Sequence, residues 1–330
     1  MITTRPRAAL VGGGALLAMA AVAVLTLGTG DFPIAPGDVV KALAGQGDAA
    51  QTFIVNELRL PRVITAILVG LALAAAGAVF QSVTRNPLGS PDILGITSGA
   101  GAAALTVVIL GGSSTQLSLA AVAGGVGTAL VIQLIGGRRG LRGHRFILIG
   151  IGMTAVLNGI VGYLLTKGVR MESARAMLWL TGSFDGRGWE EALPLLVVLL
   201  IAVPVLVLLC GPGLRMLEMG DDIAAALGVP VNRLRNGSLL LAAVVVAFAA
   251  AAAGPVNFVA LIAPNIAKRL TRAPGPNLLP SMAVGALLTV GADWLATHSG
   301  YPIPVGVVTG LLGGAYLVWL LTTERRAGRI

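Results

Sequence analysis

The chain has 330 residues, of which 56% are hydrophobic and only 11% are charged, and its mean hydropathy is +0.89. A soluble domain carries about 25% charged residues, so this composition excludes an ordinary soluble protein and indicates a polytopic membrane protein. The single Cys210 excludes an internal disulfide, and with two histidines no histidine-based metal site is expected. The net charge of +9 arises from basic residues in short loops, which is a topology signal and not a nucleic-acid patch.

Apolar segments long enough to cross a membrane follow one another along the chain. The first, 8–27, could be a signal peptide, but its length of about 20 residues and the further segments after it favour an uncleaved helix. Further spans are predicted at about 63–82, 93–111, 114–135, 145–166, 190–210, 237–254, 256–270, 279–297 and 304–322. The sequence therefore predicts an all-α fold with about ten transmembrane helices, in a single transmembrane domain over residues 1–330.

An even number of spans places both termini on the same side of the membrane. If that side is the cytoplasm, the inner loops collect most of the 23 basic residues, including the cluster Arg138, Arg139 and Arg142, while most acidic residues lie outside. Both termini are therefore expected in the cytoplasm. The loop 215–235, between the sixth and seventh spans, is then cytoplasmic as well.

This loop predicts a short helix with both ends marked. Asp221 and Asp222 stand where negative charge favours a helix N-terminus, and Gly228 stands where a left-handed residue would end the helix. The apolar residues that share one face of this helix are Ile223, Ala226 and Leu227. Because about two turns of helix are unstable alone, this face has to be buried, either against the chain itself or against a cytoplasmic partner. The residues alone leave both possibilities open.

The most specific segment runs from 57 to 101 and contains L-R-L-P-R, R-N-P-L-G-S-P-D-I-L-G and S-G-A-G. Arg59 and Arg62 are three residues apart, so both guanidinium groups can project from one side of a helix at the external surface. Asn86-Pro87 ends that helix, and Ser90-Pro91-Asp92 restarts one as cap, first-turn proline and acid. The segment predicts two helices joined by a tight turn.

These motifs resemble the FecCD family of iron-siderophore and vitamin B12 ABC importer permeases. Later segments agree in the same order, with W-L-T-G-S-F at 179–184, L-E-M-G-D-D-I-A-A-A-L-G-V at 217–229, A-G-P-V-N-F-V-A-L-I-A-P at 253–264 and P-V-G-V-V-T-G-L-L-G-G-A-Y-L at 304–317. Within the family, the stretch F-Q-S-V-T-R-N-P-L-G-S-P-D is most similar to ferric-enterobactin permeases. The resemblance implies a BtuC-like type II ABC importer permease fold in the bacterial cytoplasmic membrane, and import of a ferric siderophore of the catecholate type.

The resemblance also implies partners. These are a second permease subunit, with a homologue favoured over an identical copy, two ATP-binding subunits in the cytoplasm, an external substrate-binding protein and the membrane lipid. The sequence contains no G-x-x-x-x-G-K-[ST] phosphate loop. We therefore expect a non-catalytic chain with no cofactor of its own, driven by ATP that the partner subunits bind.

Three groups of site residues follow from the resemblance. The ATPase-docking residues are Gly220, Asp221, Asp222, Ile223, Ala226, Leu227, Gly228 and Val229. Arg59 and Arg62 are expected to receive acidic residues of the binding protein, although ordinary interfacial arginines would reach lipid headgroups instead. The candidates for the translocation path, on the fifth and tenth spans, are Gly150, Gly152, Asn158, Gly306, Gly310 and Gly314. Helix packing is the alternative role for these six residues.

Two positions depart from the family pattern. Asn265 follows Pro264 where relatives commonly carry a histidine, so no role of that histidine can be transferred. Ala296, Thr297 and His298 stand where some relatives have a further arginine, which puts a docking contact at that corner in doubt.

Asp293 is the only acidic residue well inside a predicted span. We expect it to bond exposed backbone or water near the outer end of the ninth span. An ion-coupled secondary transporter would need ionisable groups or broken helices at the membrane midplane, and Asp293 alone supports that class poorly. Within the importer class, another iron chelate, haem or vitamin B12 is the alternative solute.

Overall fold

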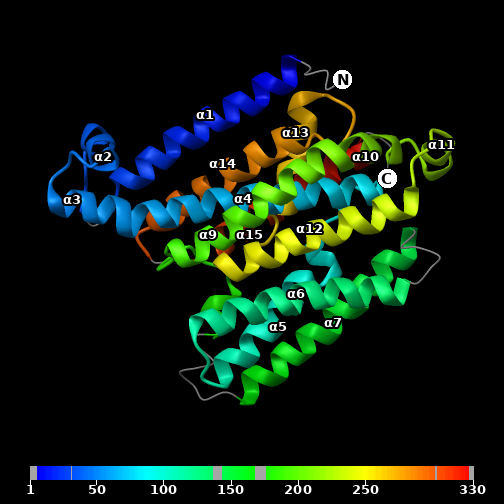
Figure 1. The fold of residues 1–330 in the computed structure, drawn as a ribbon, viewed down its shortest axis with the longest axis horizontal. Coiled ribbons are helices and arrows are strands. Elements are labelled where there is room, and N and C mark those ends of the chain that lie inside the picture. The colour runs from blue at the N-terminus through cyan, green and yellow to red at the C-terminus, as the bar shows by residue number, and fades with distance from the viewer. Residues whose placement is uncertain (1–5, 31, 137–142, 168–175, 302, 327–330) are drawn as a thin grey trace.

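The structure is a computed structural model that describes residues 6–30, 32–136, 143–167, 176–301 and 303–326. In these residues every regular element is a helix (Figure 1). The long helices are α1 (Pro6–Gly28), α4 (Leu60–Thr84), α5 (Ile96–Ile109), α6 (Ser114–Gly136), α7 (Gly143–Lys167), α9 (Trp189–Pro204), α12 (Val231–Ala253), α13 (Val259–Thr271), α14 (Leu278–Thr297) and α15 (Val305–Arg326). Each predicted span coincides with one of them, whereas the basic cluster at 138–142 lies outside the described residues.

Short elements connect or extend these helices. They are α2 (Pro36–Leu43), α3 (Ala49–Phe53), the π-helix η1 (Ile54–Arg59), the 3-10 turn η2 (Pro91–Leu94), the π-helix η3 (Val205–Cys210), α10 (Gly211–Leu217) and α11 (Asp221–Ala226). By length and composition, seven helices of the described residues can cross a membrane. The total of ten spans stays a prediction, because α5, α13 and the apolar part of α15 are shorter.

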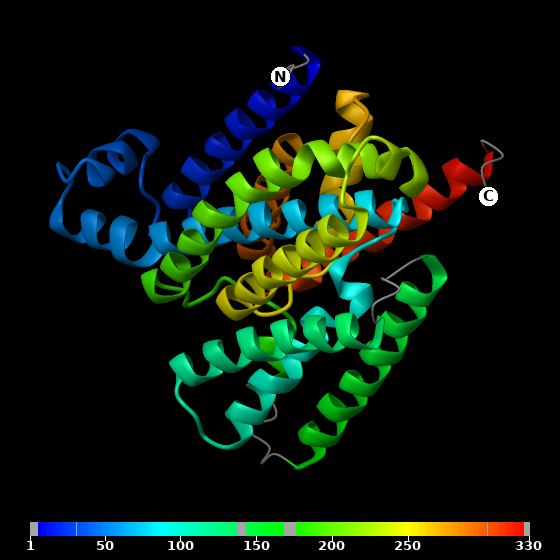
Figure 2. The same ribbon diagram turned by 45° about the vertical axis from the view of Figure 1, so that its right-hand side comes forward.

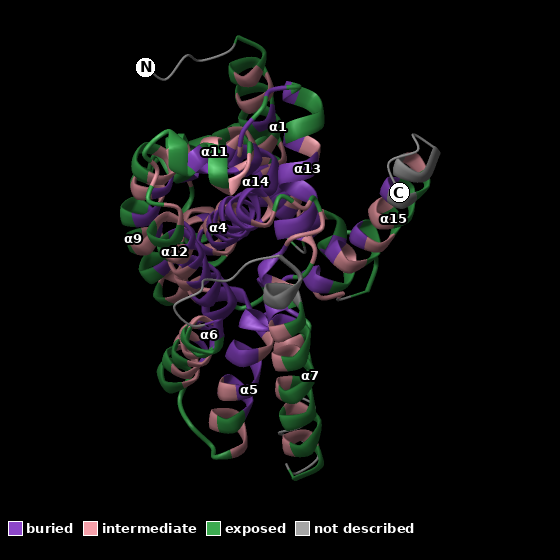
Figure 3. Cartoon of the chain, turned by 90° about the vertical axis from the view of Figure 1, so that its right-hand side faces the viewer, coloured by how far each residue is buried: buried purple, intermediate pink, exposed green. Residues whose placement is uncertain are grey.

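Helix α4 forms the centre of the molecule. In the most apolar window of the continuous helical stretch Ala49–Thr84, 83% of the residues are buried, against 6% in α1. Helices α9, α12, α13 and α14 all pack against α4, which is seen end-on and largely buried in Figure 3. Small residues allow this approach: a side chain at Gly77 would overlap the backbone oxygen of Ala260 in α13, and one at Gly70 would collide with Gly285 in α14.

A second group, α5, α6 and α7, packs along α12 and is set apart from the rest of the bundle (Figure 2). Helices α5 and α6 touch through glycine, because a side chain at Gly99 would collide with Thr128 and with the backbone of Gly124. The sequence predicts that Ser90-Pro91-Asp92 starts the long helix after α4. The structure corrects this: those residues form only the single turn η2, which Gly95 ends with φ +75°, and α5 begins after it.

The apolar run around Gly254-Pro255 breaks as the sequence predicts. Helix α12 ends at Ala253, and α13 begins after Phe258, whose φ is +68°. Helix α13 has only 13 residues, about 20 Å, and is therefore shorter than the hydrocarbon core of about 30 Å. Other parts of the chain hold it in place: the Gln81 side chain of α4 donates to the Leu261 oxygen at 3.0 Å.

The N-terminal end of α1, α11 and the C-terminal end of α15 lie at the same end of the long helices, and α2 and α3 lie at the opposite end (Figures 1 and 2). This arrangement agrees with the prediction that both termini share one side. Following the charge argument, we refer to the end with α11 as the cytoplasmic face and to the end with α2 as the external face.

Candidate functional site

Helix α11 has the ends that the sequence predicts. Asp221 and Asp222 form its first turn, and Gly228 follows its last turn with φ +83°. The Val229 N–H donates to the Ala224 oxygen at 3.0 Å, and the Gly228 N–H donates to the Ala225 oxygen at 2.9 Å. These two bonds are those of a Schellman motif, which satisfies the last carbonyls and fixes the turn before α12.

The apolar face of α11 is open. Ile223 is 50% exposed and Leu227 is 57% exposed, and the methyl group of Ala226 is also exposed. The residue of α11 that buries against the rest of the chain is Ala224, about 100° around the helix from Ile223. The sequence left open whether this face is buried against the chain itself or against a partner. In the described residues, the chain itself does not bury it. An exposed apolar face on a fixed helix is typical of an interaction surface.

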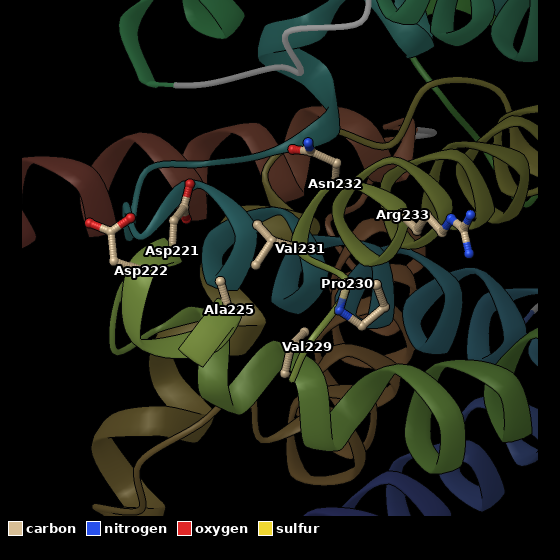
Figure 4. Close-up of a pocket in the computed structure, with 8 residues that line it drawn as sticks. All are labelled: Asp221, Asp222, Ala225, Val229, Pro230, Val231, Asn232 and Arg233. Carbon is tan, nitrogen blue, oxygen red and sulfur yellow. The ribbon is translucent and has the colours of Figure 1, made fainter. Parts of the chain in front are cut away.

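A depression of about 340 Å³ lies beside α11, between this helix and the start of α12 (Figure 4). The residues that line it are Asp221, Asp222, Ala225, Val229, Pro230, Val231, Asn232 and Arg233. The carboxylates of Asp221 and Asp222 lie at one end and the Arg233 guanidinium lies at the other (Figure 4). The cytoplasmic face thus presents apolar surface flanked by both signs of charge, which suits a folded protein partner better than a small ligand.

On the external face, Arg59 bonds back onto its own chain. It ends the π-helix η1, and its Nη1 and Nη2 donate to the backbone oxygens of Leu27 and Phe32, each at 2.8 Å. This arginine therefore ties the end of α1 and the following loop to the start of α4. A partner carboxylate would have to share the guanidinium with these two carbonyls.

Arg62 forms a two-point ion pair with Asp293 of α14. Its Nη2 donates to Oδ1 at 2.9 Å and its Nε donates to Oδ2 at 3.1 Å, and Asp293 is 1% exposed. The third nitrogen, Nη1, lies 3.1 Å from Asp185 Oδ1, whose side chain is 83% exposed. The structure therefore corrects the expectation that Asp293 bonds exposed backbone or water. A lone acid within a span signals a specific partner, but the partner, 231 residues away, is not readable from the sequence.

The six path candidates on α7 and α15 divide into two kinds. A side chain at Gly150 would approach the Ile93 oxygen to 3.0 Å, and one at Gly306 would overlap the Thr181 oxygen, so both glycines serve close packing within the chain. The residues that face open space or are exposed are Gly152, Asn158, Gly310 and Gly314. These open positions on α7 and α15 remain as candidates.

The chain matches the FecCD transport family over residues 16–323. It belongs to that family. This FecCD permease is 42% identical over 306 residues to the ferric enterobactin transport system permease protein FepG of Escherichia coli K12, covering 91% of this chain and 92% of that protein. It is 38% identical over 310 residues to the Fe(3+)-citrate import system permease protein YfmE of Bacillus subtilis 168, covering 92% of each.

Among solved structures, the FecCD permease is similar to a metal-chelate type ABC transporter in an inward-facing conformation. The TM-score is 0.84 at 30% identity, and the match covers 94% of this chain and 98% of the other. The family, the all-α ABC importer permease fold and the location as a multi-pass protein of the bacterial cytoplasmic membrane are thereby confirmed.

Proposed function

We propose that this FecCD permease is one permease subunit of an ABC importer that moves a ferric siderophore of the catecholate type into the cytoplasm. The observation that supports it most is the 42% identity, over 91% of the chain, to a protein named for ferric enterobactin transport. Other relatives are named for Fe(3+)-citrate and for vitamin B12, so the substrate class is that of bulky chelates.

The proposed partners are a second, homologous permease subunit, two ATP-binding subunits and an external binding protein. An ATP-binding subunit docks on the open apolar face formed by Ile223, Ala226 and Leu227, and the Schellman turn at Gly228 holds that face at a constant angle. ATP is bound by these partner subunits. The contribution of the FecCD permease is to convert their closure into movement of its helices, in an alternating-access cycle.

The proposed path runs along the open residues of α7 and α15. Gly152, Gly310 and Gly314 present bare backbone, and Asn158 adds a neutral polar group, so these four positions carry no charge. Such walls let a bulky solute pass without holding it tightly, which permeation requires because the solute must also leave. Selectivity then resides mainly in the binding protein.

The binding protein is proposed to dock near Arg62 through a carboxylate. Two nitrogens of this guanidinium bond to buried Asp293, whereas Nη1 bonds to exposed Asp185. A partner carboxylate can therefore replace Asp185 without breaking the buried pair. Arg59 supports the same surface by holding the loop after α1.

Purification of the tagged chain from its native membrane in mild detergent tests the proposal. The complex should contain a second permease and ATP-binding subunits, and in vesicles with its binding protein it should import a radiolabelled ferric catecholate when ATP is supplied. A complex without ATP-binding subunits would overturn the importer assignment. ATP-dependent uptake of cobalamin or ferric citrate without uptake of the catecholate would overturn the substrate.

A further inference from the structure

Glu218 lies between α10 and α11 and holds three other parts of the FecCD permease. Its Oε1 accepts a hydrogen bond from the Ser82 hydroxyl of α4 at 2.9 Å and lies 3.5 Å from Lys268 Nζ of α13. Its Oε2 accepts from the Gly275 N–H, in the loop before α14, at 3.1 Å. One carboxylate thus joins the segment before α11 to α4, to α13 and to the approach to α14.

Asp221 adds a second connection at the same place. Its Oδ1 accepts from Arg235 Nη2 of α12 at 2.7 Å and lies 3.7 Å from Nη2 of Arg85, the residue that ends α4. The Arg235 side chain is 3% exposed and that of Asp221 is 23% exposed, so water and salt reach this pair less than a pair on the open surface. Helix α11 is therefore fixed at its start to the cytoplasmic ends of α4 and α12.

The opposite end of α4 is fixed to the external face. Arg62, in its first turn, holds buried Asp293 of α14 at two points. Between the two ends, Gly77 lies directly against Ala260 of α13 and Gly70 lies against Gly285 of α14. The Thr289 hydroxyl also donates to the Ala66 oxygen at 2.7 Å across the α4–α14 contact. With close packing along its length, α4 cannot slide without carrying α13 and α14 with it.

We propose that α4, packed with α13 and α14, is the element that links the ATPase-docking face to the binding-protein-docking face, and that Glu218 is the residue that positions α11 on it. This inference rests on the proposed function. Movement of α11 reaches α4 through the Glu218–Ser82 and Asp221–Arg85 contacts and arrives at the external face at Arg62. Linkage of this kind is reciprocal. If the bound nucleotide changes the affinity for the binding protein by some factor, the bound binding protein must change the affinity for the nucleotide by the same factor.

The test uses the intact importer in lipid nanodiscs and measures the dissociation constant of its binding protein with and without a non-hydrolysable ATP analogue. Glu218→Gln keeps the side-chain size but replaces one acceptor oxygen by a donor, which leaves Ser82, Lys268 and Gly275 short of an acceptor. Glu190→Gln is the matched control, because this carboxylate is exposed on the external first turn of α9. Ser82→Ala removes the hydrogen bond to α4 alone.

The quantity compared is the factor by which the ATP analogue changes the dissociation constant of the binding protein. We expect this factor to be smaller by about 5-fold or more in Glu218→Gln, while Glu190→Gln matches the wild type. Ser82→Ala should also make this factor smaller, with ATP-binding subunits still present in wild-type amount. A local docking defect would lower that amount but would not act on the external face. A wild-type factor in both Glu218→Gln and Ser82→Ala overturns the inference. If Glu218→Gln fails to assemble, Ser82→Ala alone decides. Failure of the wild-type complex to respond to nucleotide would instead count against the proposed function.

Discussion

The two faces proposed for docking, the cytoplasmic and the external face of the FecCD permease, differ in the groups that they leave exposed. At the cytoplasmic face, charged groups tie α11 down within the chain, and apolar Ile223 and Leu227 are left exposed. At the external face, the two arginines that are candidates for docking are largely engaged inside the chain, and one guanidinium nitrogen of Arg62 faces an exposed carboxylate. We infer that the cytoplasmic contact is apolar and durable, whereas the external contact is polar, exchangeable and sensitive to salt.

The largest effect is expected from Leu227→Arg. A charge placed in an apolar interface without a partner costs several kcal/mol, so co-purification of the ATP-binding subunits should fall by about 100-fold or more. Because Leu227 is exposed in this chain, the thermal unfolding of the isolated permease in detergent should not change. Leu227→Met, which keeps an apolar side chain, is the control and should assemble normally. Normal assembly of the arginine variant would show that this face is not the docking surface.

Stability separates the two carboxylates that share Arg62. Asp293→Ala leaves a mostly buried guanidinium without its main partner, and we expect a loss of about 3 kcal/mol in the free energy of unfolding. Asp185→Ala removes an exposed partner and should change it by less than about 0.5 kcal/mol. Denaturation of both variants in the same detergent measures the difference. Equal losses would mean that the buried pair does not hold α4 to α14.

The path between the faces can be tested on α15. Gly310 faces open space, so Gly310→Leu should assemble normally. If this face of α15 lines the path, uptake should slow by about 10-fold, which corresponds to a rise of about 1.4 kcal/mol in the barrier. Gly306→Ala is the contrasting variant: its methyl group would overlap the Thr181 oxygen, so it should lower the yield of folded protein. Normal uptake by Gly310→Leu would remove α15 from the proposed path.

The smallest effect is expected at the external face. Asp185→Asn removes the negative charge beside Nη1 of Arg62, and the affinity for the binding protein should rise by about 2-fold to 5-fold, as for an exposed pair. The gain should shrink as salt is added. Titration of the binding protein at low and high salt measures it. An affinity that falls in Asp185→Asn would show that Asp185 itself contacts the partner.

Local signals were readable from the sequence, and long-range pairings were not. The break at Gly254-Pro255 and the ends of α11 at Asp221 and Gly228 follow from rules that act over a few residues, and the structure confirms them. The pairing of Arg62 with Asp293 depends on how α4 meets α14, which no local pattern encodes.

The same limit applies to the glycines of α15. Gly306, Gly310 and Gly314 recur every four residues and so lie near one face of the helix. The neighbour of each glycine is nevertheless set by tertiary packing, so Gly306 faces Thr181 while Gly310 faces open space. If Arg62 receives an acidic residue of the binding protein, reversing its charge is the obvious test of docking. The structure shows that this variant would place two carboxylates together in a buried site, so exposed Asp185 is the better position to change.

The shortness of α13 has a consequence for biogenesis. A 13-residue helix that ends in Lys268, Arg269 and Thr271 is too short and too polar to insert from the translocon as an independent unit. Its place depends on α4, through Gly77 against Ala260 and through the Gln81 bond to the Leu261 oxygen. We therefore expect α13 to enter the bilayer late in synthesis, by packing against α4, which is inserted much earlier. Insertion of α13 would then depend on α4.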